Sequence, residues 1–242
     1  MKTFNIWTCI AVLCAVITSC STTTLLTATF EGDAVGSSPD KTLPGNPSGD
    51  EIQYVSEMEP RLKVQNSTIS GAKALHFTLA PIADISGHQR GVSFKGTSTN
   101  LTETVWFMFS GQNTNATSND VYMDLSDGAS HPIARLTIKP NGNVELTNDL
   151  TYTTSELIGN VGTEVHTILF TTFAGTLKYN VSIYKETGPA ILKENRNMLT
   201  TNPTEFVNPA RPTISFSNQG TSGSQIYAIG NVLITRRQPD MP

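Results

Sequence analysis

Apolar and polar residues alternate along much of the chain, and residues 176–185 show this pattern most clearly. In this segment one face carries apolar side chains, and the opposite face carries polar side chains together with Tyr184. The apolar face is formed by Leu177, Tyr179, Val181 and Ile183. Because successive side chains of a strand point to opposite faces, the period of two predicts a half-buried strand in an antiparallel sheet.

Further segments carry similar strand signals, and turn-forming residues separate them. They are residues 25–30, 61–66, 74–80, 103–111, 120–127, 132–139, 165–173, 213–218 and 225–236. Asn141 and Gly142 lie between two of these segments, which is a strong hairpin signal. Helical periodicity is nearly absent, and only residues 190–199 leave room for one helical turn. The pattern predicts an all-β fold of about ten to fourteen strands, a two-sheet antiparallel β-sandwich that forms a single domain over residues 25–238.

The first residues resemble an export signal more than a membrane span. Lys2 precedes an uncharged, largely apolar run over residues 6–17. This run is shorter than the roughly 20 apolar residues that a transmembrane helix needs. A short apolar run after a basic residue is typical of a cleaved secretory signal, so we expect residues 1–19 to be a signal peptide.

The residues around the expected cleavage point resemble the bacterial lipobox. Ile17, Thr18 and Ser19 supply an aliphatic residue and two small residues directly before Cys20. The resemblance implies a bacterial lipoprotein in which Cys20 becomes the lipid-bearing N-terminus and residues 20–24 form a short tether. The alternative is an ordinary cleaved signal in which this cysteine stands by chance.

Cysteine usage and charge exclude several kinds of chemistry. All three cysteines, Cys9, Cys14 and Cys20, lie in the leader, so the remaining chain has no disulfide, thiol nucleophile or cysteine metal site. The formal net charge is −4, and charged residues make up 15% of the chain without forming long runs. This balance lacks the basic patch that nucleic-acid binding requires, so no nucleic-acid partner is expected.

Two segments at the ends of the expected domain resemble domains of the concanavalin A-like lectin/glucanase superfamily. The stretch ATFEGDAVGSSP, residues 28–39, is similar to their opening strand and turn. The stretch IYAIGNVLIT, residues 226–235, is similar to their closing strand. The resemblance implies a LamG-like jelly roll in which the first and last strands are neighbours in one sheet.

The same resemblance implies a structural calcium ion, the one cofactor that the sequence suggests. Its ligands would be Glu31 and Asp33 near the first strand and Asn231 in the last strand. Gly230 stands where these domains usually have an aspartate, so one carboxylate ligand is missing. The alternative is that Glu31 and Asp33 accept backbone N–H groups and stabilise a turn.

Acidic residues offer no convincing catalytic pair. Glycanases of this superfamily carry acids at alternating strand positions, so that two carboxylates face one groove. The nearest candidates, Asp124 and Asp127, are three positions apart and would point to opposite faces of a regular strand. We therefore expect no retaining glycosidase.

Other catalytic arrangements have little support. The histidines are scattered, without the spacing of a zinc site, and are His76, His88, His131 and His166. A polysaccharide lyase on a similar fold would need residue types that are also present here, in His166, Tyr179, Tyr184, Arg135 and Gln112. We expect His166 instead to be a solvent-side residue that opposes the apolar face of its strand.

Aromatic residues are candidates for ligand binding, because sugars stack on exposed rings. Trp106 lies in the apolar stretch VWFMF, so we expect it in the core. Tyr122, Tyr179 and Tyr184 are the candidate ligand-binding residues. Tyr184 is the best of them, because it opposes the apolar face of its strand.

The leading hypothesis is a lipid-anchored, non-catalytic β-sandwich protein of the bacterial cell envelope, on the periplasmic side or the outer surface. It would bind carbohydrate or another envelope component, and its partners would be the membrane and a glycan. The alternatives are a glycoside hydrolase or polysaccharide lyase on the same jelly roll, and a purely structural envelope protein. A groove lined by rings and by Asn or Asp would favour binding, whereas a flat or apolar-filled face would favour structure.

Overall fold

The computed structural model describes most of the expected domain. The described residues are 23–41, 51–54, 61–78, 90–101, 103–114, 120–129, 131–201, 210–218 and 225–241. The expected signal peptide, Cys20 and His88 lie outside them.

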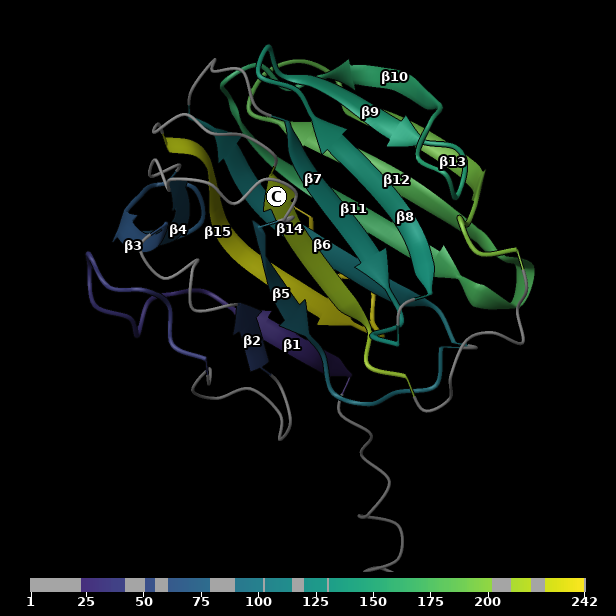
Figure 1. Ribbon diagram of the computed structural model, residues 1–242, viewed down its shortest axis with the longest axis horizontal. Coiled ribbons are helices and arrows are strands. Elements are labelled where there is room, and N and C mark those ends of the chain that lie inside the picture. The colour runs from purple at the N-terminus through teal and green to yellow at the C-terminus, as the bar shows by residue number, and fades with distance from the viewer. Residues whose placement is uncertain are drawn as a thin grey trace, which may run out of the picture.

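The strands of these residues form two antiparallel sheets that lie face to face (Figure 1). The eight-stranded sheet has the order β13 (Ile191–Asn197), β12 (Lys178–Lys185), β11 (Val165–Phe173), β6 (Val105–Asn113), β15 (Gln225–Thr235), β4 (Lys73–Thr78) and β3 (Leu62–Asn66), and β1 (Thr24–Ala28) also pairs with β15. The seven-stranded sheet has the order β10 (Ser155–Asn160), β9 (Asn143–Thr147), β8 (Pro132–Ile138), β7 (Val121–Ser126), β14 (Thr213–Asn218), β5 (Arg90–Lys95) and β2 (Glu51–Tyr54). The predicted all-β sandwich is confirmed, and the first and last strands are neighbours.

Helical structure is limited to one short turn in the described part of the chain, the 3-10 turn η2 (Ala174–Thr176) between β11 and β12. No helix among the described residues is long and apolar enough to span a membrane. Residues 190–199, where the sequence left room for a helical turn, contain strand β13 instead. That expectation is therefore wrong.

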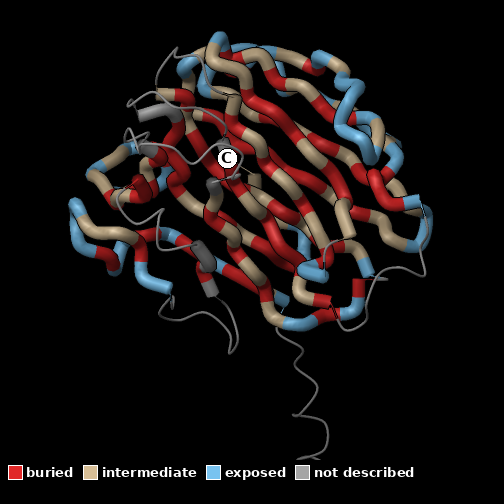
Figure 2. The backbone as a smooth tube through the Cα atoms, in the orientation of Figure 1, coloured by how far each residue is buried: buried red, intermediate tan, exposed pale blue. Residues whose placement is uncertain are grey.

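The core lies between the two sheets and consists of their inward-facing residues, which alternate with less buried ones along each strand (Figure 2). Four phenylalanine rings form a chain of edge-to-face contacts with centroids 5.0 to 6.1 Å apart. They are Phe30, Phe94, Phe216 and Phe109. Because Phe109 belongs to the eight-stranded sheet and Phe216 to the other, this chain of rings holds the sheets together.

Two local predictions are confirmed by the backbone. Strand β12 buries Tyr179, Val181 and Ile183 and leaves Tyr184 half-buried on its other face. The β8–β9 hairpin turns at Asn141 and Gly142, where the Asn141 Oδ1 atom accepts the Asn143 N–H at 3.0 Å. Gly142 has a φ of 82°, which explains the need for glycine there.

Candidate functional site

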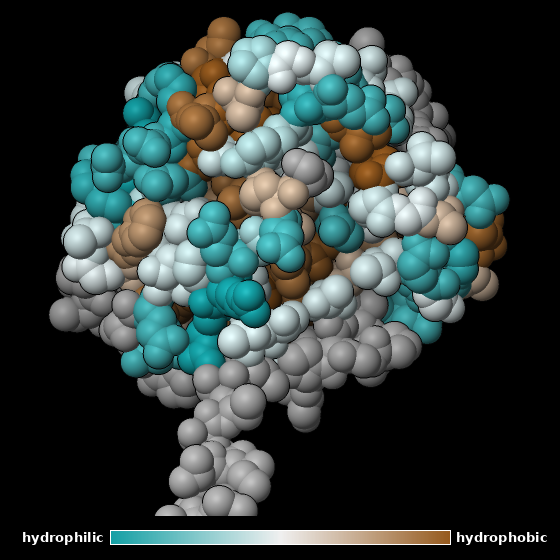
Figure 3. All heavy atoms as spheres, turned by 180° about the vertical axis from the view of Figure 1, so that it is seen from behind, coloured by the Kyte–Doolittle hydropathy of each residue, from teal (hydrophilic) through white to brown (hydrophobic). Residues whose placement is uncertain are grey.

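A pocket of about 590 Å³ opens on the outer face of the eight-stranded sheet, the face turned away from the core. Figure 3 views the molecule from this side and shows apolar residues in the hollows between polar ones. The floor comes from β6, β11 and β15, and three other segments provide the walls. The walls come from the turn before β4, the end of β12 with the residues after it, and the segment after β15. Their residues are Ile69, Ser70, Tyr184, Lys185, Glu186, Gly188, Ala190, Asp240 and Met241.

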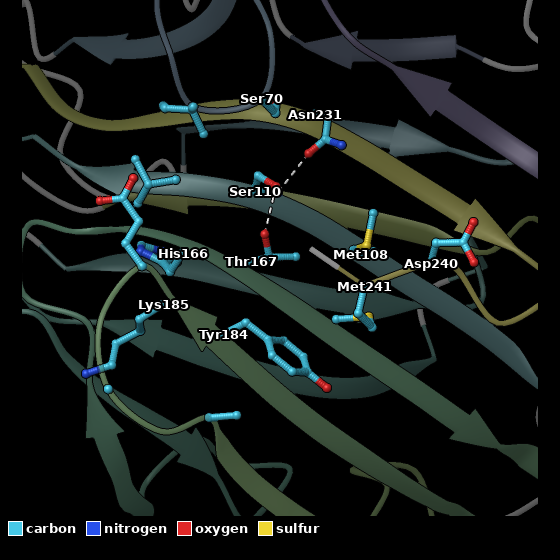
Figure 4. Close-up of a pocket in the computed structure, with 15 residues that line it drawn as sticks. Ser70, Met108, Ser110, His166, Thr167, Tyr184, Lys185, Asn231, Asp240 and Met241 are labelled. Atoms are coloured by element: carbon cyan, nitrogen blue, oxygen red, sulfur yellow. Dashed lines mark hydrogen bonds between the residues drawn. The ribbon is translucent and has the colours of Figure 1, made fainter.

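The floor is a chain of polar groups across three neighbouring strands (Figure 4). The Asn231 Oδ1 atom accepts the backbone N–H of Ser110 at 3.0 Å. The Ser110 Oγ and Thr167 Oγ1 atoms form a second hydrogen bond, also of 3.0 Å. The Asn231 Nδ2 group has no hydrogen-bond partner among the described residues, so it remains available as a donor to a ligand.

An irregularity in β15 explains why Asn231 has this position. The pairing of β15 with β6 shifts register between Ile229 and Asn231, so Gly230 is an extra residue in the strand. A Cβ atom on Gly230 would lie 2.4 Å from the Ser70 Oγ atom. The absence of a side chain at Gly230 therefore lets the wall segment at Ser70 approach the floor closely.

Tyr184 provides the aromatic part of the pocket. It lies opposite Thr167 in the β11–β12 pairing, and Figure 4 shows its ring near Met241 and Met108. Its hydroxyl group makes no hydrogen bond with the described residues. Tyr184 thus presents a partly open ring and a free hydroxyl beside the polar floor.

Three charged side chains surround this pocket, namely Lys185, Glu186 and Asp240. Glu186 and Asp240 are exposed, and Lys185 is half-buried. With two carboxylates and one ammonium group, the pocket carries no excess of positive charge. It is therefore unsuited to a strongly anionic ligand.

His166 borders the pocket but is buried, so it does not lie on the solvent side as expected. Its side chain is 1% exposed, with the Nδ1 atom 3.0 Å from the Glu164 carbonyl oxygen and the Nε2 atom 2.6 Å from the Tyr227 hydroxyl oxygen. Burial lowers the pKa of His166 to about 4, so the ring is neutral at pH 7. The expectation of a solvent-side His166 is wrong, because the strand turns its even-numbered residues inward.

A glycine makes this buried contact between His166 and Tyr227 feasible. Gly111 lies opposite His166 in the β6–β11 pairing and opposite Ile229 in the β6–β15 pairing. A Cβ atom on Gly111 would lie 2.2 Å from the Tyr227 hydroxyl oxygen. The Tyr227 side chain therefore passes over Gly111 to reach the histidine of the next strand.

The other candidate tyrosines lie away from the pocket. Tyr179 is 1% exposed and packs against Phe170, and burial raises its pKa to about 12 despite the opposing effect of nearby Arg196. Such a position is that of a core residue rather than of a surface ligand-binding ring. Tyr122 lies on the outer face of the seven-stranded sheet, with the Arg135 guanidinium carbon 5.5 Å from its ring centre. The three tyrosines therefore do not form one site.

Trp106 also differs from the prediction. It is half-buried on the outer face of β6, where it alternates with the buried residues Val105 and Phe107. The expectation that Trp106 lies in the core is therefore wrong. Residues 105–109 are all apolar, so the sequence did not show that buried and half-buried side chains alternate there. Trp106 and Met108 share the outer face.

The acids that a glycanase would need do not come together in β7. Asp124 forms a bidentate ion pair with Arg135, with distances of 2.6 and 2.8 Å. Asp127 is buried and accepts hydrogen bonds from the backbone of Ala129 and His131. Its carboxylate also lies 2.7 Å from the His131 ring, so both acids have structural partners.

The remaining residue types of the lyase alternative are also dispersed. Gln112 donates to the Thr163 carbonyl oxygen, and Arg135 is held on the opposite sheet. His166 and Tyr184 both border the pocket, but His166 is buried and neither Arg135 nor Tyr179 lies there, so the full set does not share one groove.

The residues expected to bind calcium are already engaged within the protein. The Glu31 Oε1 atom accepts the N–H groups of Ala72 and Lys73, and the Asp33 Oδ1 atom accepts that of Asp40. Asn231 lies in the pocket floor, bound to Ser110. No cluster of three or more His, Cys, Asp or Glu suitable for a metal occurs in the described part of the chain. These three residues therefore do not fit a shared calcium ion, and Glu31 and Asp33 match the alternative of turn stabilisation.

Comparison with known proteins identifies the fold. No family model and no curated protein matches the chain. Among solved structures, a GH131 beta-glucanase catalytic domain from Podospora anserina is similar with a TM-score of 0.51 and 16% identity, covering 83% of this chain and 90% of that chain. A sialidase is similar with a TM-score of 0.50 and 12% identity, covering 78% of this chain but only 19% of the sialidase chain. Lectin II from Ulex europaeus gives a TM-score of 0.48 and 10% identity, with 87% of this chain and 97% of the lectin covered.

The two-sheet architecture and the similarity to the glucanase domain define the class of the fold, which is a concanavalin A-like jelly roll. The resemblance seen in residues 28–39 and 226–235 is confirmed at the level of the fold. Identities this low carry no information about the ligand.

Proposed function

We propose that the protein is a non-catalytic carbohydrate-binding β-sandwich whose site is the pocket on the outer face of the eight-stranded sheet. The observation that carries this proposal is the combination of Tyr184, Asn231 and Asp240 in one pocket of about 590 Å³. The fold is compatible with this proposal, because a glucanase catalytic domain has a similar architecture.

The chemistry of these three residues suits a sugar ring. A sugar has an apolar C–H face that can stack on the Tyr184 ring, and hydroxyl groups that both donate and accept hydrogen bonds. The free Nδ2 group of Asn231 can donate to a sugar oxygen, and the Asp240 carboxylate can accept from a sugar hydroxyl. A mainly apolar hollow with a few polar groups is typical of small-ligand sites.

The charge of the pocket points to an uncharged glycan. Glu186 and Asp240 offset Lys185, so acidic sugars would meet net repulsion. Both carboxylates are exposed, whereas a catalytic acid is usually kept protonated by burial. This exposure supports binding without hydrolysis.

A binding screen on an array of neutral glycans tests the proposal, with the purified full chain as the probe. We expect saturable binding that weakens at least about fivefold in Tyr184→Ala, because the loss of a stacked ring costs on the order of 1 kcal/mol or more. Tyr122→Ala is the matched control, because this ring lies on the other sheet and should leave binding unchanged. Equal losses in both variants, or cleavage of a bound glycan, would contradict the proposal.

We also propose that the protein is attached to a membrane of the bacterial cell envelope through lipid on Cys20. The lipobox-like residues 17–20 support this, as does the short polar segment before β1. Mass spectrometry of the N-terminal peptide of the processed protein is the direct test. A diacylglycerol-modified Cys20 is expected, and an unmodified N-terminus cut elsewhere would rule the anchor out.

A further inference from the structure

Two backbone carbonyl groups in the loop after β1 bind the ammonium group of Lys73. The Lys73 Nζ atom lies 2.9 Å from the Glu31 carbonyl oxygen and 2.6 Å from the Asp33 carbonyl oxygen. These distances are those of charge-assisted hydrogen bonds. Lys73 is the first residue of β4, so it reaches the loop from a strand more than forty positions further along the chain.

The backbone at Ala72 and Lys73 also donates hydrogen bonds to this loop. The Glu31 Oε1 atom accepts the N–H groups of Ala72 and Lys73 at 2.8 and 3.1 Å. A Cβ atom on Gly71 would lie 2.4 Å from the same oxygen, so the carboxylate fits closely against the turn. Loop and turn are therefore joined by one ammonium group and one carboxylate, each bound to backbone of the other segment.

The oxygen atoms of this loop have the chemistry of a cation site. Backbone carbonyl oxygens and carboxylates are the usual ligands of a hard divalent cation. Here two carbonyl oxygens, those of Glu31 and Asp33, converge on the Lys73 ammonium. An ammonium group offers three donors, which suits two carbonyl acceptors at hydrogen-bond distance.

We propose that Lys73 is the built-in cation of the Glu31–Asp33 loop and takes the place of a structural calcium ion. The stability of the fold is then independent of calcium. Removal of the Lys73 side chain leaves the two carbonyl oxygens without a cation, which creates a site that a calcium ion can fill.

Lys73 is also a positioning residue for the pocket, an aspect that rests on the proposed function. The turn that it fixes contains Ile69 and Ser70, which form a pocket wall and lie against Gly230. The Ser67 backbone N–H donates to the Ala72 carbonyl oxygen and closes the same turn. A cation at this place therefore holds the wall against the floor.

Thermal unfolding of the full chain in EDTA and in millimolar calcium chloride tests the proposal without any glycan. We expect one midpoint for the wild type under both conditions. In EDTA, Lys73→Ala should lower the midpoint by roughly 3–8 °C, because two carbonyl oxygens lose a charged donor. Calcium should recover about half of this loss or more.

Lys63→Ala is the matched control, because Lys63 lies on the neighbouring strand β3 and its side chain makes no hydrogen bond or ion pair with the described residues. This variant should show no response to calcium. A calcium shift in the wild type, an unchanged midpoint in Lys73→Ala, or a loss that calcium does not restore would each overturn the proposal. This experiment does not test the proposed glycan site, because the unfolding midpoint is measured without a glycan.

Discussion

A histidine can remain neutral inside a β-sandwich when both of its ring nitrogens have partners. His166 meets this condition through the Glu164 carbonyl oxygen and the Tyr227 hydroxyl group. The carbonyl can only accept, so the Nδ1 atom carries the proton and the Nε2 atom accepts from Tyr227. Protonation of the Nε2 atom would remove this acceptor and place a charge in the core.

The stability of the fold should therefore depend on the protonation of His166. Burial lowers the folded-state pKa from 6.5 to about 4, so the stabilisation is fully present above pH 6.5 and is lost as the pH falls toward 4. The total loss is about 3 kcal/mol, from 1.4 kcal/mol for each unit of difference. Urea unfolding at neutral pH and at about pH 4, the folded-state pKa, measures most of this loss.

A matched pair of variants separates His166 from other acid effects. His166→Gln should remove most of this pH dependence, whereas His131→Gln should keep it, because that variant leaves both partners of the His166 ring in place. The Asp127 pKa is lowered, since hydrogen bonds from His131 and Ala129 outweigh burial, so its effect appears only at more acidic pH. An unchanged pH slope in His166→Gln would assign the effect to another group.

At the scale of single elements, strand β13 shows how side-chain bonds replace regular pairing. The β12–β13 register shifts between Tyr179 and Val181, and Asn195 has a φ of 55°. The Asn180 Oδ1 atom accepts the Asn195 N–H at 2.9 Å. An edge strand with this irregularity has no alternating apolar pattern, which explains why residues 190–199 did not predict it.

Asn180→Ala should loosen β13 while the rest of the fold stays intact. Loss of one exposed hydrogen bond costs about 1 kcal/mol, which corresponds to roughly fivefold faster local opening. Hydrogen exchange of the β13 amides measures this opening, with β6 as an internal reference. Ser182→Ala, on the same face of β12, is the control and should leave the exchange of β13 unchanged. Global acceleration of exchange in Asn180→Ala would show that β13 does not open on its own.

For the whole molecule, the sequence predicted the two-sheet fold but only part of the pocket. Tyr184 could be placed on an outer face because strict alternation assigns faces within one strand. Asn231 was noticed for a different reason, as a calcium ligand, because the shift that turns it toward Ser110 depends on pairing with β6. Asp240 and Met241 follow the last strand and gave no signal, since their contribution to the pocket depends on the path of the chain after β15.

The sequence could not show that Tyr122 and Tyr184 lie on different sheets. Tyr122 and Tyr184 both oppose buried residues in their strands, yet they lie on opposite outer faces of the sandwich. On the Tyr122 side, the Arg135 guanidinium carbon lies 3.9 Å from the ring centre of Tyr152 and is paired with Asp124. The assignment of strands to sheets depends on contacts between distant segments, and local patterns do not encode it.

Because β1 pairs with β15, the two ends of the domain lie side by side and could be joined without changing the fold. Thr24 lies opposite Thr235, and the Arg236 N–H donates to the Thr23 carbonyl oxygen at 2.7 Å. A circular permutant that joins residues 23 and 236 through a short linker, with new ends at the exposed Gly175, should therefore keep the β-sandwich circular dichroism spectrum. It would lack Asp240 and Met241, so we expect it to fold yet to bind glycan more weakly. A permutant that binds as tightly as the original chain would show that the segment after β15 is dispensable for recognition.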